Sequence, residues 1–210
     1  YQPRPGERRF LSLEDAGGTA DPAKYEQVFC GDLDASTPEE VFLRFNMKCH
    51  PLFRGYSLSV GDVVTMGGQS YYCQPVRFQE IDFDESRVPG QDDLLRIVYV
   101  EPNRPAFESM IPDKLNYLQQ AVQGPIEVIH LGEGALLVCN EEGKLRNLTG
   151  CRRIDSAIIA GAFFIVGDDG EDFRSLTEQE TSRWLEQFSQ PEKITQKEVS
   201  DDMWFKFYTF

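Results

Sequence analysis

Two adjacent residues, Cys49 and His50, are of the types that form a catalytic thiol–imidazole pair. Such a pair works only when the imidazole lies within hydrogen-bonding distance of the thiol and can take up its proton. Neighbouring residues point roughly 100° apart on a helix and to opposite faces of a strand. Pro51 also indicates a loop here, so the two side chains do not readily meet. We predict no catalytic residues and expect that the chain is not an enzyme.

Metal-binding chemistry is also poorly supported by the spacing of the acidic residues. Carboxylates recur in Asp32 and Asp34, in Asp82 and Asp84, and in residues 168–172. The last group lacks the alternating acids that precede the glycine in a calcium loop. With only two histidines and no paired cysteines, a zinc site would lack ligands. We therefore predict no metal and no cofactor.

The first candidate binding surface lies on residues 53–64. Apolar residues alternate there, at Tyr56, Leu58 and Val60, which is typical of a half-buried strand. Leu58 and Val60 are then expected to face the core, with the intervening residues turned to solvent. The residues on the solvent side, which we predict to contact a protein partner, are Arg54, Ser57 and Ser59.

A second candidate surface is the aromatic C-terminal segment, residues 203–210. As part of its own domain it would complete a sheet, and as a free tail it would add a strand to a partner. The candidate binding residues here are Trp204, Phe205 and Phe207. The basic pair Arg152–Arg153 is expected at a solvated turn.

Composition narrows the class of partner. The chain has 210 residues, 40% of them hydrophobic, and a formal net charge of -14 spread over both halves. Such a surface repels phosphate, which argues against direct nucleic-acid or anionic-membrane binding. No apolar run approaches the roughly 20 residues of a membrane span. The five scattered cysteines favour reduced thiols and a cytoplasmic location.

Local signals predict a mixture of strands and helices. Residues 25–33 and 94–100 are predicted strands, and the apolar run of residues 158–166 is interrupted by Gly161. Helices are expected after Thr37 and after Thr177, because each is followed three residues later by a glutamate that completes a capping box. We predict an α+β fold of two small domains, each a mainly antiparallel sheet with one or two helices packed on a face.

The domain boundaries follow from a change in composition. Residues 82–93 are acidic and contain a Pro-Gly pair, which is typical of a linker. The prediction is a first domain over residues 1–81, a linker over 82–93, a second domain over 94–190 and a C-terminal tail over 191–210.

Two sets of residues resemble known families. Residues 25–29, 42–46 and 53–64, the last containing Ser57-Leu58-Ser59-Val60-Gly61-Asp62-Val63-Val64, resemble the YodL-like domain across residues 9–81. Residues 98–102, 137–144, 159–167 and 172–177 resemble family 3846 of domains of unknown function across residues 94–188. The resemblance implies an accessory protein of plasmids, conjugative elements or phages of Firmicutes, and it implies no catalytic residue.

The leading functional hypothesis is therefore a non-enzymatic interaction or regulatory protein of a mobile genetic element, with a protein partner. The alternative is an acidic DNA mimic that occupies a restriction or defence enzyme, suggested by the charge of -14. A mimic needs an elongated acidic face nearly free of bases. The bases within both halves, such as Arg54 and Arg146, predict acidic patches that are short and interrupted.

Overall fold

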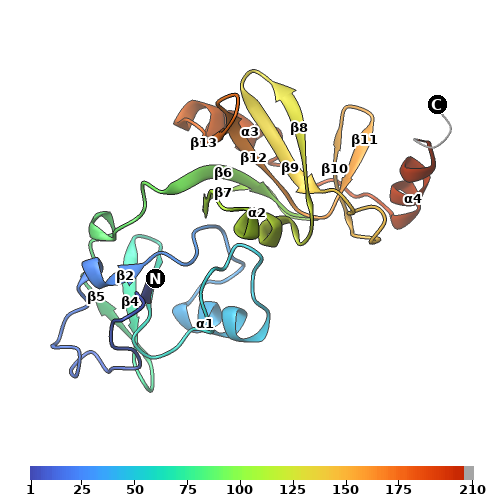
Figure 1. Cartoon of the computed structure of the whole chain (residues 1–210). Helices are drawn as coiled ribbons and strands as arrows, with labels where there is room; N and C mark the ends of the chain where they lie inside the picture. Colours follow the sequence, from blue (N-terminus) through green and yellow to red (C-terminus); the bar gives the residue numbers. More distant parts are fainter. Residues whose placement is uncertain (206–210) are drawn as a thin grey trace. The chain divides into compact units, whose positions relative to one another are not determined.

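The computed structural model describes residues 1–205, with side chains described through residue 203. The chain divides into two compact units, Tyr1–Asp93 and Leu94–Phe210, each combining antiparallel strands with helices (Figure 1). The predicted α+β fold of two domains is confirmed. None of the helices in the described part of the chain has the length and apolar character that crossing a bilayer requires.

The first unit is built on a three-stranded antiparallel sheet of order β3-β4-β5, beside a two-stranded pair of β1 and β2. Its elements are β1 (Gln2–Pro3), the 3₁₀ turn η1 (Pro22–Lys24), β2 (Tyr25–Glu26), α1 (Pro38–Met47), β3 (Val63–Met66), β4 (Gln69–Cys73), β5 (Phe78–Ile81) and the 3₁₀ turn η2 (Glu85–Arg87). Long irregular segments connect these short elements.

The three-stranded sheet is covered on both faces because successive strand residues point to opposite sides. On one face Val64 packs with Val41 and Phe45 of α1. On the other face Val63 packs with a cluster that includes Phe83 and Val88. Residues 82–93 therefore belong to the first unit, whose boundary falls after Asp93, and the linker predicted there is corrected: two of its apolar side chains are core residues.

Helix α1 begins where the sequence predicts. The Thr37 side chain accepts a hydrogen bond from the Glu40 backbone N–H at 3.2 Å, and Pro38 occupies the first turn. Both features satisfy or remove backbone donors that a helix start leaves unpaired. The helix buries Val41 and Phe45, four residues apart on one side, and this places an aromatic ring beside the sheet.

The second unit contains a larger sheet, in which the path β7-β6-β12-β9-β8 is antiparallel throughout and β13 also pairs with β12. Its elements are β6 (Leu94–Val100), β7 (Phe107–Pro112), α2 (Leu115–Val122), β8 (Ile126–Gly132), β9 (Ala135–Asn140), β10 (Gly150–Ile154), β11 (Ala157–Ala160), β12 (Phe163–Asp168), β13 (Phe173–Arg174), α3 (Glu178–Gln187) and α4 (Gln196–Phe205). Strands β10 and β11 form a separate hairpin.

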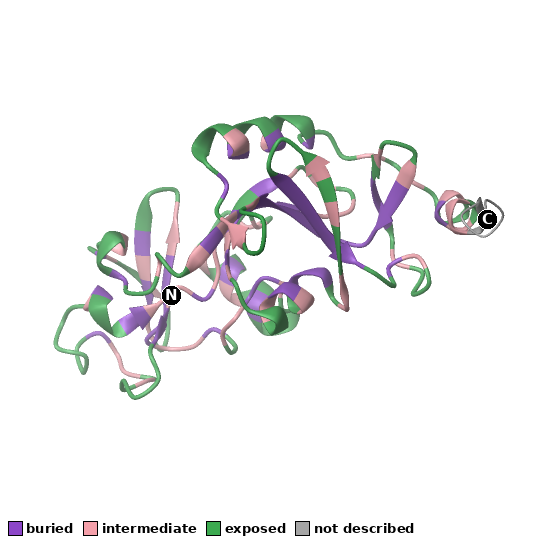
Figure 2. Ribbon diagram, turned by 45° about the horizontal axis from the view of Figure 1, so that its top comes forward, coloured by how far each residue is buried: buried purple, intermediate pink, exposed green. Residues whose placement is uncertain are grey.

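Helices α2 and α3 cover opposite faces of the larger sheet. Val98 packs in one cluster with Trp184 of α3, whereas the neighbouring Tyr99 donates a hydrogen bond to the Ala121 carbonyl of α2 at 2.7 Å. Adjacent strand residues point to opposite faces, so the two helices must lie on different sides. The central strands are consequently buried almost continuously and appear purple in Figure 2.

Gly161 divides the longest apolar run into two strands. It has φ +90°, and a Cβ there would lie 2.7 Å from the Leu148 side chain, so no other residue fits without strain. The chain turns at this point from β11 into β12, and the two strands enter different sheets.

Helix α4 was not expected from the sequence. Thr195 accepts from the Glu198 backbone N–H at 3.3 Å while the Glu198 carboxylate accepts from the Thr195 backbone N–H at 2.8 Å. This reciprocal capping box in Thr195-Gln-Lys-Glu198 is the signal that reveals the helix. Val199 anchors the helix in an apolar cluster with Ile158 and Ala160 of β11.

Candidate functional site

The recognisable stretch of residues 53–64 is a loop followed by the start of β3, so the strand predicted from its alternating apolar residues is corrected. A buried carboxylate holds the loop. Asp62 Oδ2 accepts from the Ser59 backbone N–H at 2.9 Å and from Gln2 Nε2 at 2.9 Å. Gly61, with φ +97°, provides the backbone turn between them. The motif is therefore a turn around Asp62, and burial raises the pKa of Asp62 to about 6.

Gln2 connects the N-terminal segment to the same loop. Its side-chain amide donates to the Tyr56 carbonyl at 2.7 Å and accepts from the Tyr56 N–H at 3.1 Å, as a neighbouring strand would. Leu58 is buried as predicted, with 8% of its surface exposed, whereas Val60 is only half-buried. The loop thus turns Leu58 into the core by side-chain hydrogen bonds and not by strand pairing.

The candidate binding residues Arg54, Ser57 and Ser59 do not share a strand face, because no strand forms. The Arg54 guanidinium is half-buried and donates to the Gln27 carbonyl. Ser57 is exposed, and the Ser59 backbone is engaged by Asp62. The strand face on which these three side chains were expected to lie together therefore does not form.

A cavity of about 410 Å³ lies in the first unit beside this loop. The residues that line it come from residues 1–2, residues 27–35, α1, the 53–58 loop, β3 with the turn after it, and η2. They are Tyr1, Gln2, Gln27, Val28, Phe29, Cys30, Gly31, Asp32, Leu33, Ala35, Val41, Phe45, Phe53, Leu58, Val63, Val64, Thr65, Met66, Gly67 and Glu85. A volume of this size lies in the range of small-molecule and side-chain binding pockets.

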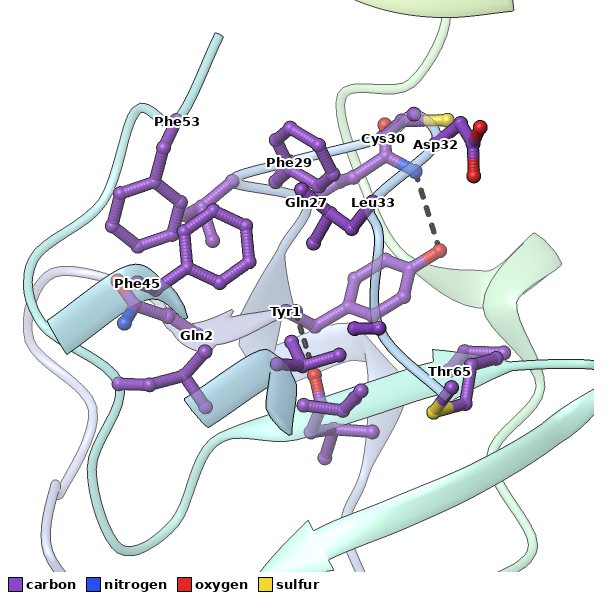
Figure 3. A pocket seen from close by; sticks show the side chains of 18 of the residues that line it. Tyr1, Gln2, Gln27, Phe29, Cys30, Asp32, Leu33, Phe45, Phe53 and Thr65 are labelled. Atoms are coloured by element: carbon purple, nitrogen blue, oxygen red, sulfur yellow. Dashed lines mark hydrogen bonds between the residues drawn. The ribbon is translucent and has the colours of Figure 1, made fainter. Parts of the chain in front are cut away.

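Three aromatic rings form one end of this pocket. The ring centroids of Phe45 and Phe53 lie 4.4 Å apart in a stacked arrangement, and Phe29 meets Phe45 edge-on at 5.0 Å. Figure 3 shows the three rings gathered on one side, with Asp32 and Cys30 at the other end. This end offers a large, rigid apolar contact area.

The opposite end of the pocket is polar. The Tyr1 hydroxyl donates to the Glu85 carboxylate. It accepts from Gln27 Nε2 at 3.3 Å (Figure 3). Burial and the hydrogen bond to Glu85 raise the pKa of the Tyr1 phenol far above its usual value, so it remains a neutral donor. The charged residues in the lining, Asp32 and Glu85, are both acidic. The pocket thus combines an apolar end with a polar end that contains acidic side chains.

The outer edge of β3 forms part of the pocket wall. Val63 N–H donates to the Tyr1 carbonyl at 3.0 Å, and the Tyr1 nitrogen donates to the Val63 carbonyl at 2.8 Å. Both backbone groups of Val63 therefore point away from β4. Because alternate residues of a strand direct these groups to the same side, those of Thr65 also point outward. No described residue outside the β3–β4 ladder hydrogen-bonds to them.

Each half of the chain matches the model of one protein family. Residues 7–83, which carry the Asp62 turn and much of the pocket, match the model of the YodL-like domain. Residues 95–189 match that of a domain of unknown function, DUF3846. A YodL-like domain precedes a DUF3846 domain. Both resemblances predicted from the sequence are confirmed, and the two matches fall within the two units. No curated protein and no solved structure matches the chain.

His50, which the sequence places beside Cys49, contacts other residues. In the YodL-like domain Cys49 is exposed, while His50 Nδ1 accepts from the Leu52 N–H at 3.1 Å and its ring packs against Phe29. Among the described residues, no three histidine, cysteine, aspartate or glutamate side chains gather as a metal site. In residues 168–172 the backbone forms a turn, in which Asp168 Oδ1 accepts from the Gly170 N–H at 2.8 Å.

The DUF3846 domain contains a buried basic residue that the sequence did not predict. The solvated turn expected for Arg152–Arg153 is wrong, because both residues lie in β10 and Arg152 is only 1% exposed. Its guanidinium donates to the carbonyls of Cys151 at 2.8 Å, Arg104 at 2.7 Å and Phe188 at 3.3 Å. Arg153 instead forms surface ion pairs with Glu192 and Glu198.

The aromatic candidates near the C-terminus lie largely outside the described residues. Trp204 and Phe205 are the last two residues of α4, so the segment begins as a helix and not as the expected strand. Their side chains lie beyond the described part of the chain, as does all of Phe207. The structure therefore assigns these residues no role. The pocket, in contrast, was missed from the sequence because its rings come from three separate segments.

Proposed function

We propose that the chain is a non-enzymatic interaction protein that binds a protein partner through the aromatic pocket of its first unit. The observation that carries the proposal is the cavity of about 410 Å³ lined by the contacting rings of Phe29, Phe45 and Phe53. Rigid aromatic groups bind with little loss of conformational entropy, which is why they dominate the energetics of protein interfaces.

The biological setting of this interaction is also part of the proposal. The resemblance to the two families suggests an accessory or regulatory protein of a mobile genetic element, acting in the cytoplasm. The scattered cysteines support a reducing compartment, since paired disulfides would need a regular framework. The partner would then be another protein of the element or of its host.

The alternative, an acidic mimic of DNA, has less support. A mimic must present carboxylates at a spacing near the roughly 1.7 Å per charge of duplex DNA, without interspersed bases. Many carboxylates in the described residues instead pair with basic side chains. These pairs include Asp34 with Arg44, Asp21 with Arg87, Glu108 with Arg96, Glu180 with Arg174, and Glu133 with Arg183. We therefore keep the pocket as the basis of the proposed function.

The proposal is tested by selecting ligands from a random 12-residue peptide library displayed on phage, with the full chain immobilised by a C-terminal tag. Leu33→Trp places a larger side chain at the pocket lining. The matched control, Leu43→Trp, makes the same change on the outer face of α1, where Leu43 is 55% exposed. Circular dichroism and thermal unfolding establish that both variants are folded before selection.

We expect the native chain and Leu43→Trp to enrich the same peptides and Leu33→Trp to lose at least tenfold in affinity for them. Ala35→Phe, which fills the pocket from a different position in its lining, should reproduce this loss. A library that shows no enrichment, or one whose selected peptides bind Leu33→Trp and Ala35→Phe as well as the native chain, contradicts the proposed function.

A further inference from the structure

Strand β8 lies at one end of the larger sheet of the second unit. It pairs with β9 on one side, and no described strand pairs with its other side. The Glu141 N–H donates to the Pro125 carbonyl at 2.9 Å, so this pair, which continues the β8–β9 ladder, is hydrogen-bonded. Hydrogen-bonded pairs alternate along an antiparallel ladder. Counted from Pro125, the backbone groups of Val128 and His130 therefore point away from β9, along the outer edge of β8.

This outer edge is open, whereas the edges of the β10–β11 hairpin are closed by carboxylates. The Arg153 N–H of β10 donates to Glu192 at 3.1 Å, and the Ile158 N–H of β11 donates to Asp202 at 3.1 Å. In the described part of the chain, no group hydrogen-bonds to the outward N–H and carbonyl groups of Val128 and His130. Such a row of unpaired backbone groups is a template for an additional strand.

A pocket of about 210 Å³ adjoins the open edge. Its wall is formed by β8, by β10 with the turn after it, and by α3. In Figure 1 the β10–β11 hairpin lies beside the β8–β9 hairpin, on the side of β8. This volume is below the range of small-molecule pockets and suits a single side chain. The lining residues are Ile129, His130, Leu131, Arg153, Ile154, Asp155, Trp184 and Gln187.

Trp184 gives this pocket a polar group that lacks a partner. The indole is only 6% exposed, and its Nε1–H has no acceptor among the residues that the structure describes. A buried indole N–H ordinarily finds a hydrogen-bond partner, and leaving it without one costs free energy. A ligand side chain that carries an oxygen into the pocket supplies the missing acceptor.

We propose that β8 binds an extended segment of a protein partner, which adds as a strand at Val128 and His130 and places one side chain in the pocket beside Trp184. Main-chain hydrogen bonds supply affinity in this mode of recognition, and pockets for alternate side chains supply specificity. The site lies in the second unit, so it is separate from the aromatic pocket of the proposed function and gives the chain a second place to bind protein.

The lining predicts which side chain enters the pocket. Ile129 and Leu131 pack on the face of the sheet that carries Trp184, and the side chains of an added strand alternate between the two faces. The peptide residue opposite one of them therefore enters the pocket, while its two neighbours point to the other face. Glutamine combines an aliphatic stem with a carbonyl acceptor, and the carboxylate of Asp155 in the lining disfavours glutamate.

The experiment selects 12-residue peptides displayed on phage against the full chain carrying Leu33→Trp, so that the first-unit pocket does not compete. Val128→Pro then removes one outward N–H, a change that edge strands tolerate because this group makes no bond within the sheet. Val128→Thr keeps the N–H and the branched shape, and it is the matched control. We expect Val128→Pro to weaken peptide binding about tenfold and Val128→Thr to weaken it less than about threefold.

Two measurements on the peptide do not depend on how the protein tolerates proline. Methylating each peptide nitrogen in turn removes one N–H at a time, and losses of about tenfold should occur at every second position. Replacing the peptide glutamine by leucine should weaken binding about fivefold on the native indole and less than about twofold on Trp184→Phe, because the acceptor matters only while the Nε1–H is present.

Each contrary outcome has a definite meaning. No enrichment, or no alternation on methylation with equal binding to Val128→Pro and Val128→Thr, overturns strand addition. An equal effect of the glutamine on Trp184→Phe overturns the assignment of the pocket. A dimer in analytical ultracentrifugation that Val128→Pro converts to a monomer means that a second copy of the chain occupies the edge, and a separate partner is then wrong. The proposed function is tested by Leu33→Trp and this site by Val128→Pro, so either can fail alone.

Discussion

The two units build their cores in different ways. In the second unit, Leu137, Phe163 and Ile165 are completely buried in long strands that carry helices on both faces. In the first unit, five short strands and one α-helix support long irregular segments, and about 410 Å³ between them remains open. Continuous apolar strands leave little space within the core because their side chains interlock along the whole sheet. Irregular segments leave a shaped pocket, so the looser unit is suited to recognition.

The largest expected effect comes from equal truncations in the two cores. Leu137→Ala in the second unit should cost about 4 kcal/mol of unfolding free energy, because its tightly packed surroundings cannot collapse around the lost side chain. Leu58→Ala, beside the pocket, should cost about 2 kcal/mol, because the native site is already incompletely packed. Native-state hydrogen exchange of the full chain, analysed separately for peptides from each unit, measures both losses of unfolding free energy. Equal costs would mean that the two cores are packed alike.

The second unit also differs from the first in containing a buried arginine, Arg152. Arg152→Met should destabilise the second unit by about 3 kcal/mol, because the carbonyls of Glu101, Arg104, Cys151 and Phe188 lose a buried donor. Arg153→Met, the adjacent control, breaks only partly exposed ion pairs and should cost less than about 1 kcal/mol. Both tryptophans lie in this unit, so urea unfolding followed by tryptophan fluorescence reports on it directly. Similar losses for both variants would contradict the structural role of Arg152.

In the first unit the buried charge is Asp62, and its effect depends on pH. Burial raises its pKa from 3.8 to about 6, so the folded chain binds a proton in this range that the unfolded chain does not. The unfolding free energy contributed by this group therefore falls as pH rises from about 4 to about 6 and then levels off.

The variant Asp62→Asn isolates this contribution. The amide oxygen can still accept the hydrogen bonds from Ser59 and Gln2, so the change at pH 7 should stay within about 1 kcal/mol. The pH-dependent loss between about 4 and 6 should be reduced in the variant. Urea unfolding at a series of pH values measures the slope, and an unchanged slope would show that another group titrates.

The smallest expected effect concerns the boundary between the units. Phe83 and Val88 are buried, whereas Asp92 and Asp93 are exposed just before β6. Limited proteolysis with Asp-specific cleavage should therefore cut at residues 92–93 before it cuts at residues 82–84. Mass spectrometry of the first fragments identifies the cut, and early cleavage beside Phe83 would restore residues 82–93 as a linker.

Short-range sequence signals alone were sufficient to predict several elements of this molecule. The capping residues Thr37 and Thr177 predicted α1 and α3, since a cap satisfies donors within three residues of itself. The run of residues 94–100 predicted β6, because a strand buried on both faces needs apolar residues throughout. The mixture of predicted strands and helices on either side of residues 82–93 also predicted the two-domain α+β fold. Each of these features depends on residues that are close together in the chain.

Tertiary structure decided the features that depend on distant residues. The alternating residues before β3, 53–62, form a loop, in which Gln2, far away in the chain, supplies hydrogen bonds that a neighbouring strand would have made. Arg152 is buried because carbonyls from separate segments converge on its guanidinium. The pocket arises where Phe29, Phe45 and Phe53 meet at the edge of β3. No local sequence pattern predicts these contacts, because each one joins residues that are far apart in the sequence.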